Sequence, residues 1–284
     1  MLGISSSWYA AQGKTVYESV KAANGLGFRL VELGAAHRFE ERVFDTVKQV
    51  KHDFPDMLFT VHSYFPPIFR EPVMINICKG LTLENRKAFD SLFKAASIVR
   101  AEVVSMHSGT LTDYEACGED KQMKGMIAFR QTKGIEHDLG LKNACSSLQY
   151  CLRLAGDYGI KLCIENLPNP KTVLLSKVED FSSMLEQFPR LGLLIDVGHS
   201  PSLFSDPYWF ECFKDRIFEM HIHDFSRAKG LDHQVVGSGD LDFKRIFSSE
   251  VIRRIPLILE HSAMVSEPEL LEERELLKKR YSIT

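Results

Sequence analysis

The sequence lacks several features that mark particular classes of protein. Its six cysteines include no Cys-x-x-Cys pair, and no apolar run approaches the ~20 residues that a membrane-spanning helix needs. The opening segment MLGISSSWYA has no basic region followed by an apolar stretch, which is the pattern of a secretory signal. Because disulfides concentrate in oxidising compartments, we expect reduced thiols, a cytoplasmic location and no membrane partner.

Neither sign of charge predominates. The formal net charge of −3 provides no overall attraction to nucleic acid, so binding of that kind would need a local basic surface or bound cations. Hydrophobic residues make up 44% of the chain and charged residues 26%, the balance of an ordinary globular protein. A chain of this length buries a large core without disulfides.

Short apolar runs alternate with longer stretches of helical periodicity along the whole chain. The expected strands are Leu2–Ser6, Leu30–Leu33, Leu58–His62, Glu102–His107, Lys161–Glu165, Leu191–Asp196, Ile217–His223 and Pro256–Glu260. The expected helices are Thr15–Leu26, Phe39–Phe54, Leu83–Arg100, Leu141–Tyr158, Val178–Phe188, Asp206–Lys214, Asp242–Ser249 and Glu267–Tyr281. Eight strand–helix units predict an α/β fold, a single (β/α)8 TIM barrel with parallel strands over residues 1–284; a doubly wound open sheet is the alternative.

Three segments need their own interpretation. Residues 110–140 are irregular and too long for an ordinary βα loop, which predicts a lid, a binding loop or an oligomer contact. Gly237-Ser-Gly239 is interpreted as a tight turn beside the site, with a phosphate-binding loop as the weaker alternative. The run Leu270–Lys279 predicts a helix with a solvated charged face and no functional role.

In a parallel barrel the active site lies at the C-terminal ends of the strands. Those ends carry many ionisable residues, namely Glu32, His62, His107, Glu165, Asp196, His221, His223, Glu260 and His261, with His199, Asp232 and His233 in the loops that follow. A single such residue is usually a helix cap or a hydrogen-bonded rim residue. Together, however, the carboxylates would repel one another unless a cation lies between them.

The strand ends therefore predict a divalent metal site. Its expected ligands are Glu165, Asp196, His221 and Glu260. Mixed carboxylate and imidazole donors suit Mn2+, Zn2+ or Co2+ better than Mg2+ or Ca2+. Between one and three ions are expected, depending on how many of the other histidines bind metal.

The segments CIENLPNP, LIDVGHS, HIHDFSRAKGLDHQVVGSGDLDF and LILEHS resemble those of the xylose isomerase-like TIM barrels. That superfamily includes sugar isomerases and epimerases and the endonuclease IV group of AP endonucleases. Resemblance to its ketose 3-epimerases implies that Glu165 and Glu260 are both metal ligands and the catalytic acid/base pair. It also implies that His199 and Arg227 contact the substrate. Lys171 stands where those epimerases carry a further Glu, so substrate recognition must differ.

Resemblance to the endonuclease IV group implies additional metal ligands instead. These would be His62, His107, His199, Asp232 and His233. The match is imperfect, because Asp232 directly precedes His233 where that group has Asp-x-His. Under the sugar-enzyme interpretation, His62, His107 and His199 would instead bind substrate hydroxyls.

Three functions follow from these observations. The favoured one is a divalent-metal-dependent isomerase or epimerase that acts on a small sugar or sugar phosphate by proton transfer next to a metal-polarised carbonyl. The alternative is an endonuclease IV-like phosphodiesterase with a di- or trinuclear zinc cluster, whose partner would be nucleic acid. A non-catalytic ligand-binding barrel is the least favoured, and an oligomer is compatible with all three.

Overall fold

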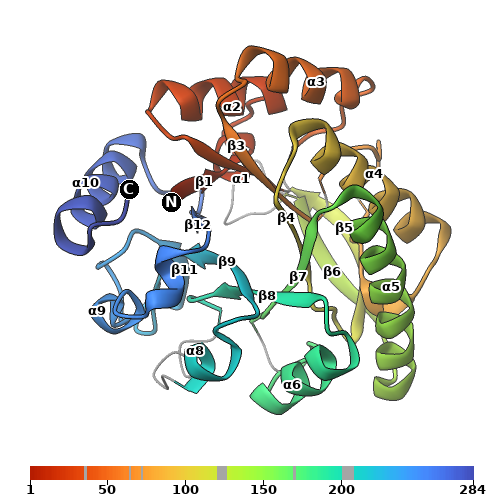
Figure 1. Ribbon diagram of the computed structural model, residues 1–284. Coiled ribbons are helices and arrows are strands. Elements are labelled where there is room, and N and C mark those ends of the chain that lie inside the picture. Colours follow the sequence, from red (N-terminus) through yellow and green to blue (C-terminus); the bar gives the residue numbers. More distant parts are fainter. Residues whose placement is uncertain (35–36, 64, 72, 120–126, 169–170, 200–207) are drawn as a thin grey trace.

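Eight parallel strands close into a barrel in the computed structural model, which describes residues 1–34, 37–63, 65–71, 73–119, 127–168, 171–199 and 208–284 (Figure 1). In chain order the barrel strands are β1 (Leu2–Ser5), β2 (Leu30–Leu33), β3 (Leu58–His62), β4 (Val103–His107), β7 (Lys161–Glu165), β8 (Leu191–Asp196), β9 (Ile217–Ile222) and β12 (Leu257–Leu259). Their order around the barrel is β1-β12-β9-β8-β7-β4-β3-β2. The predicted TIM barrel is confirmed, and the open sheet is wrong.

Helices surround the barrel on its outside (Figure 1). They are α1 (Ser6–Ala10), α2 (Val16–Gly25), α3 (Val43–Asp53), α4 (Leu83–Val99), α5 (His137–Tyr158), α6 (Val178–Gln187), α8 (Tyr208–Phe213), α9 (Phe243–Ile246) and α10 (Glu267–Tyr281), with 3₁₀ turns η1 (Ile77–Lys79) and η2 (Glu250–Arg253). Local sequence explains where several begin. Ser266 caps α10 by a reciprocal pair of bonds with Glu269, which satisfies amide groups that the first turn leaves free.

The barrel strands are covered on both faces, so most of their residues are apolar, without the alternation of a half-exposed strand. All six residues of β8 are buried, and so are the four residues of β1 and of β2. The chain ends meet beside the barrel, where the amide of Leu2 donates to the carbonyl of Thr284 at 2.9 Å. No helix in the described part of the chain is long and apolar enough to cross a membrane.

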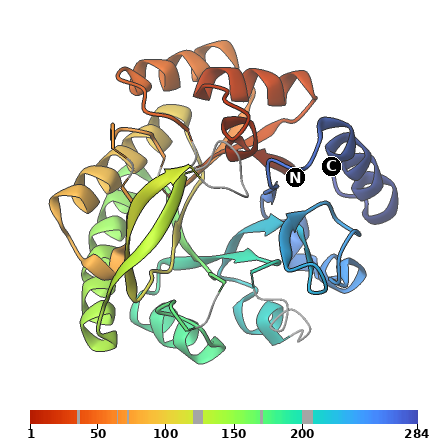
Figure 2. The ribbon, with the colours of Figure 1, turned by 180° about the vertical axis from the view of Figure 1, so that it is seen from behind.

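Two β-hairpins differ from the predicted pattern. Within residues 110–140, β5 (Thr112–Glu119) and β6 (Ile127–Gly134) pair antiparallel, and α5 begins at His137 instead of Leu141. The expectation of an irregular segment is therefore wrong, because cross-strand bonds satisfy this backbone locally. A shorter hairpin of β10 (Asp224–Ser226) and β11 (Leu231–Gln234) follows β9. Figure 2 shows the β5–β6 hairpin, in yellow-green, in front of α5.

Candidate metal centre

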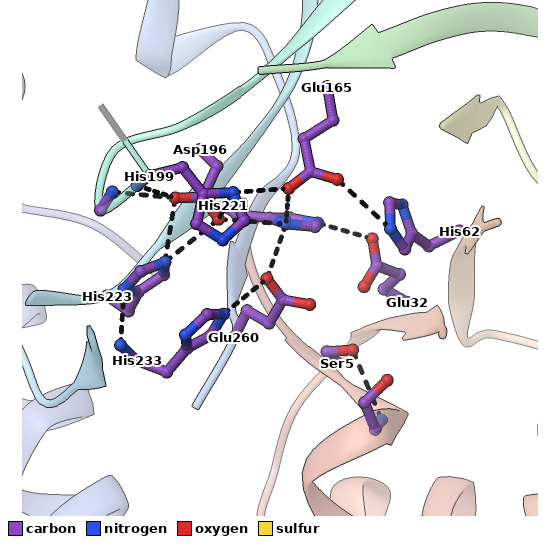
Figure 3. A network of polar contacts seen from close by, with 12 residues as sticks. Ser5, Glu32, His62, Glu165, Asp196, His199, His221, His223, His233 and Glu260 are labelled. Carbon is purple, nitrogen blue, oxygen red and sulfur yellow. Dashed lines mark hydrogen bonds and ion pairs between the residues drawn. The ribbon is translucent and has the colours of Figure 1, made fainter. Parts of the chain in front are cut away.

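The four predicted metal ligands come together at one end of the barrel (Figure 3). Glu165 ends β7, Asp196 ends β8, His221 lies near the end of β9, and Glu260 directly follows β12. These strands are consecutive around the barrel, and Asp196 pairs in register with His221. One donor atom from each residue lies within 4.8 Å of the others. Strand order and register thus gather residues that are far apart in the sequence.

His221 is the central residue of this group. Its Nδ1 lies 2.9 Å from Glu260 Oε2, 3.7 Å from Asp196 Oδ2 and 3.8 Å from Glu165 Oε1. Glu165 Oε2 is fully buried and makes no hydrogen bond, and the fully buried Nδ1 of His221 faces three carboxylates. Buried polar atoms without a partner are costly in a folded protein. A divalent cation fits them, since carboxylate oxygens and imidazole nitrogens are ligands for Zn2+ and similar ions.

Two further groups of donors share a carboxylate with the first, and a fourth group of Glu32, His62 and His221 shares His221 with it. His62 and His107 approach Glu165, with their Nε2 atoms 3.4 and 3.5 Å from its Oε2. On the other side, a group comprises Asp196, His199, His223 and His233. Glu165 and Asp196 each belong to two groups, so the three groups form one continuous cluster, named here the donor cluster.

The electrostatics of the donor cluster show how its charges are balanced. Burial lowers the pKa of His199, but the charges of Asp196 and Glu165 outweigh burial and raise it to about 9. The pKa values of His221 and His233 lie well above their usual range, because nearby carboxylates outweigh the same effect of burial. Protons on three imidazoles thus balance the negative charge of the carboxylates, as a bound cation also would.

The carboxylates themselves are ionised. Burial would raise the pKa of Glu260, yet the charge of His221 and hydrogen bonds from His221 and His233 hold it well below its usual range. The pKa of Glu165 is also lowered, since the surrounding histidines outweigh burial. The side chain of Glu260 is 18% exposed and that of Glu165 only 1%. Of these two carboxylates, Glu260 is therefore the more accessible to a molecule in the barrel mouth.

Two of the predicted site residues lie outside the three donor groups. Asp232 is half exposed and contacts His233, with 3.2 Å between its Oδ1 and the Nδ1 of the histidine. Arg227 is exposed after β10, where its backbone amide donates to Asp240 Oδ2 at 2.6 Å. Among the contacts of the described residues, none joins the Arg227 guanidinium to the donor cluster.

His223 is not among the predicted site residues, yet it belongs to the donor group of Asp196, His199 and His233. Its Nδ1 accepts from the backbone amide of His233 at 2.9 Å, so in its neutral form the ring carries its proton on Nε2. That nitrogen lies 2.9 and 3.1 Å from the two oxygens of Asp196. The sequence signal was the spacing of His221 and His223, since residues two apart in extended chain point to the same side.

His233 is held in an unusual backbone conformation. Its φ of 53° lies in the left-handed region, which residues other than glycine rarely adopt. The conformation is fixed on both sides: His223 accepts from its amide, and its carbonyl accepts from the amide of Ser262 at 3.0 Å. Its ring stacks on that of His223 with centroids 4.1 Å apart. Such outliers persist where surrounding contacts enforce them, as they do here.

The segment Gly237–Gly239 serves the fold of the site and not a phosphate. Asp224 Oδ2 accepts from the amides of Gly237 and Gly239 at 2.9 and 2.8 Å. A Cβ at Gly239 would lie 2.3 Å from the carbonyl oxygen of Phe225, so the turn needs glycine there. The tight-turn interpretation is confirmed. The phosphate-loop alternative is wrong, because an internal carboxylate already occupies these amides.

Comparison with known proteins places this geometry in a wider context. The sequence model of a family described as "Xylose isomerase-like TIM barrel" matches residues 20–280. An uncharacterized protein from Methanocaldococcus jannaschii is 29% identical over 108 residues, which cover 36% of this chain and 36% of that protein. The match thus spans about a third of that relative's length.

Several solved structures share the fold. A D-tagatose 3-epimerase-like protein superimposes with a TM-score of 0.70 at 18% identity, covering 98% of this chain and 96% of that one. D-psicose 3-epimerase with D-tagatose from Clostridium cellulolyticum H10 gives 0.69 at 12% identity, covering 99% and 98%. A probable 3-DHS dehydratase from Bacillus anthracis gives 0.70 at 14% identity, covering 98% and 99%. Likeness at these identities shows a common fold.

Proposed function

Because the chain belongs to the xylose isomerase-like TIM barrel family, we propose that it is a divalent-metal-dependent isomerase or epimerase of a small sugar or sugar phosphate. One observation carries the proposal. Two ionised carboxylates, Glu165 and Glu260, reach the same buried donor group from different strands, around His221. Proton transfer beside a carbonyl needs a base of this kind and a means to stabilise the charge that develops.

The metal would polarise the substrate carbonyl, and the side chains of Glu260 and Glu165 transfer the protons. A divalent ion held by Glu165, Asp196, His221 and Glu260 would supply Lewis acidity toward the carbonyl oxygen of a substrate. Glu260, ionised and partly exposed, takes the proton from the carbon beside that carbonyl. The electron pair of the broken C–H bond forms a C=C bond, and the carbonyl π pair moves to oxygen to give an enediolate. Because Glu165 is ionised, it first takes up a proton, which the His199 imidazolium can supply since its Nδ1 lies 3.1 Å from Glu165 Oε1, and then donates it to the opposite face of the same carbon, which inverts that carbon. Protonation of the neighbouring carbon, with transfer of the hydroxyl proton to the other oxygen, gives isomerisation, and Glu260 and His199 regain their starting protonation states by exchange with water.

The rim of the site supplies groups for recognition. His107 and His233 are 31% and 25% exposed, so their rings line the open side of the donor cluster. Imidazole donates or accepts hydrogen bonds and therefore suits sugar hydroxyl groups. Two of the solved structures named above are a 3-epimerase-like protein and a 3-epimerase with D-tagatose, which supports ketoses as the first substrates to examine.

The test is proton exchange at the substrate. Protein loaded with Mn2+ or Co2+ is incubated with a panel of ketoses and ketose phosphates in deuterated water, and deuterium beside the carbonyl is followed by NMR. We expect exchange for at least one substrate, with loss of about a hundredfold or more in Glu260→Gln. Glu250→Gln, which changes an exposed glutamate on η2, is the matched control. Metal-loaded protein that exchanges no proton on any sugar of the panel contradicts the proposal.

A second candidate function has one specific observation in its favour. The donor groups of His62 with His107 and of His199 with His233 adjoin the first through Glu165 and Asp196, which suits two or three ions. Multinuclear sites of this kind support phosphodiester hydrolysis. Metal content per chain separates the candidates: one ion supports the isomerase. Two or three ions, together with chelator-sensitive nicking of abasic-site DNA, would establish the hydrolase instead.

A further inference from the structure

Helix α10 contains a buried glutamate. The sequence of this helix predicts a solvated charged face and no functional role, yet the side chain of Glu273 is only 1% exposed. Glu273 lies between Leu270 and Leu277 on the face that packs against the barrel, whereas Glu272 and Glu275 on the same helix are exposed. A buried carboxylate is costly unless it is fully hydrogen-bonded. The charged face is solvated as predicted, but Glu273 lies outside it, on the buried face.

Both oxygens of Glu273 bind groups in other segments. Oε1 accepts from the backbone amide of Val236 at 2.6 Å, and Oε2 lies 2.5 Å from Nε2 of His261. The His261 side chain is fully buried as well. Hydrogen bonds to a carboxylate are among the strongest in proteins, and burial away from water strengthens them further. One side chain of α10 thus joins two loops.

Each of these loops carries a member of the donor cluster. His261 directly follows Glu260, and Val236 lies three residues after His233. The loops also bind each other, since the amide of Ser262 donates to the carbonyl of His233. At the site itself, Nε2 of His233 lies 3.5 Å from Oε2 of Glu260.

We propose that Glu273 is a positioning residue that fixes Glu260 and His233 relative to each other, and that it thereby sets the metal affinity of the donor cluster. The inference rests on the metal-binding part of the proposed function. Glu273 reaches no donor atom of the cluster itself; it acts through His261 and the amide of Val236. Residues that orient metal ligands in this indirect way typically change metal affinity by about 10- to 100-fold when removed.

The experiment uses Co2+ as the probe, on full-length protein stripped of metal. Affinity is measured by competition with a chelator, and ligand geometry by the visible absorption of bound Co2+. Glu273→Leu should weaken binding by about 10-fold or more and alter the spectrum. Glu273→Gln should retain both, because its amide oxygen accepts from Val236 and its NH2 donates to the other neutral tautomer of His261.

A matched control separates positioning from simple docking of the helix. Leu277→Ala removes a fully buried apolar side chain from the same face of α10 and leaves the hydrogen bonds of Glu273 to both loops intact, so it should lower the Tm and leave Co2+ affinity and spectrum unchanged. If Glu273→Leu does not fold, His261→Leu replaces it as the test variant. It removes the hydrogen bond between Glu273 and His261 and is expected to weaken Co2+ binding in the same direction.

Two results would overturn the inference. One is an affinity for Co2+ in Glu273→Leu that equals that of the wild type. If Glu273→Leu does not fold, the same result in His261→Leu has this meaning. The other is equal weakening in Leu277→Ala at a comparable fall in Tm, which would assign the effect to helix docking. Failure of the wild-type protein to bind Co2+ is a different outcome. It refutes the metal-dependent function, and with it the positioning role of Glu273.

Discussion

Nε2 of His221 lies 2.8 Å from Oε2 of Glu32, and both side chains are completely buried. Glu32 is on β2 and His221 on β9, so the contact crosses the barrel interior. An imidazole that donates from Nε2 keeps the lone pair of Nδ1 free, and here Nδ1 faces Glu165 and Glu260. Carboxylates that hold a metal-binding histidine in this way fix its tautomer and its orientation.

Replacement of Glu32 should therefore weaken metal binding. We expect Glu32→Leu to lower the affinity for Co2+ or Zn2+ by about 10- to 100-fold in chelator competition. Glu32→Gln should lose less, because its amide oxygen still accepts from Nε2. Affinity unchanged in Glu32→Leu would show that the ring is oriented by other contacts.

The matched control is a second glutamate of the barrel interior. Burial, reinforced by the charge of Glu32, raises the pKa of Glu219 to about 8, so at pH 7 its carboxyl is mainly neutral. Glu219→Gln replaces a neutral acid by a neutral amide of the same shape. It should leave metal affinity within about twofold of wild type, since no charge is lost at neutral pH.

Sequence was sufficient for the barrel but not for the two hairpins. Eight buried strands such as Leu191–Asp196 give apolar runs whose alternation with helices is visible without coordinates. The hairpin strand Thr112–Glu119 is mixed in polarity and partly exposed, and its register shifts twice, so it has no regular period. Local pairing, which no single-residue pattern reveals, determines its structure.

A glycine beside the site provides another prediction. A Cβ at Gly198 would lie 1.9 Å from Cε1 of His223, so Gly198→Ala must displace that ring. The displacement breaks the contact of His223 with Asp196 and its stacking on His233. We expect a loss of about 1–3 kcal/mol in the free energy of unfolding, measured in urea on metal-free protein.

Gly25→Ala is the control for that substitution. Gly25 is in α2, and a Cβ there meets no atom within 4 Å, so alanine should be neutral or stabilise by up to about 1 kcal/mol. A Gly198→Ala protein as stable as wild type would mean that the His223 ring has room to move.

Acid should destabilise the protein through His37. Burial lowers the pKa of this histidine to about 4, and its Nε2 lies 3.0 Å from the hydroxyl oxygen of Ser6. The unfolded chain takes up the proton near pH 6.5, whereas the folded protein resists it until about pH 4. The stability that depends on neutral His37 is therefore full above pH 6.5 and is lost as the pH falls toward 4.

His37→Gln should remove this contribution. Unfolding in urea between pH 7 and pH 4 should give a flatter pH profile for the variant than for wild type, with a difference of at most about 3 kcal/mol. His52→Gln, at an exposed position on α3, is the control. Parallel profiles for His37→Gln and wild type would assign acid lability to other groups.

The sequence predicted which residues at strand ends come together, but not the contacts that come through loops. Glu165, Asp196 and His221 occupy barrel strands, so the fold alone brings them together. The roles of Glu273 and His223 depend on hydrogen bonds to the amides of Val236 and His233, which belong to loop backbone. Backbone direction in a loop is not encoded in residue type, which explains why these contacts were not predicted.

The last prediction concerns His107, whose two proposed roles give opposite results. Under the isomerase proposal His107 binds a substrate hydroxyl, so His107→Gln should raise KM by about 10-fold, the cost of one lost hydrogen bond, and leave the metal content unchanged. If His107 and His62 instead hold an ion with Glu165, the variant should lose one metal per chain. Elemental analysis with steady-state kinetics distinguishes these outcomes. His137→Gln, at an exposed position at the start of α5, should change neither quantity.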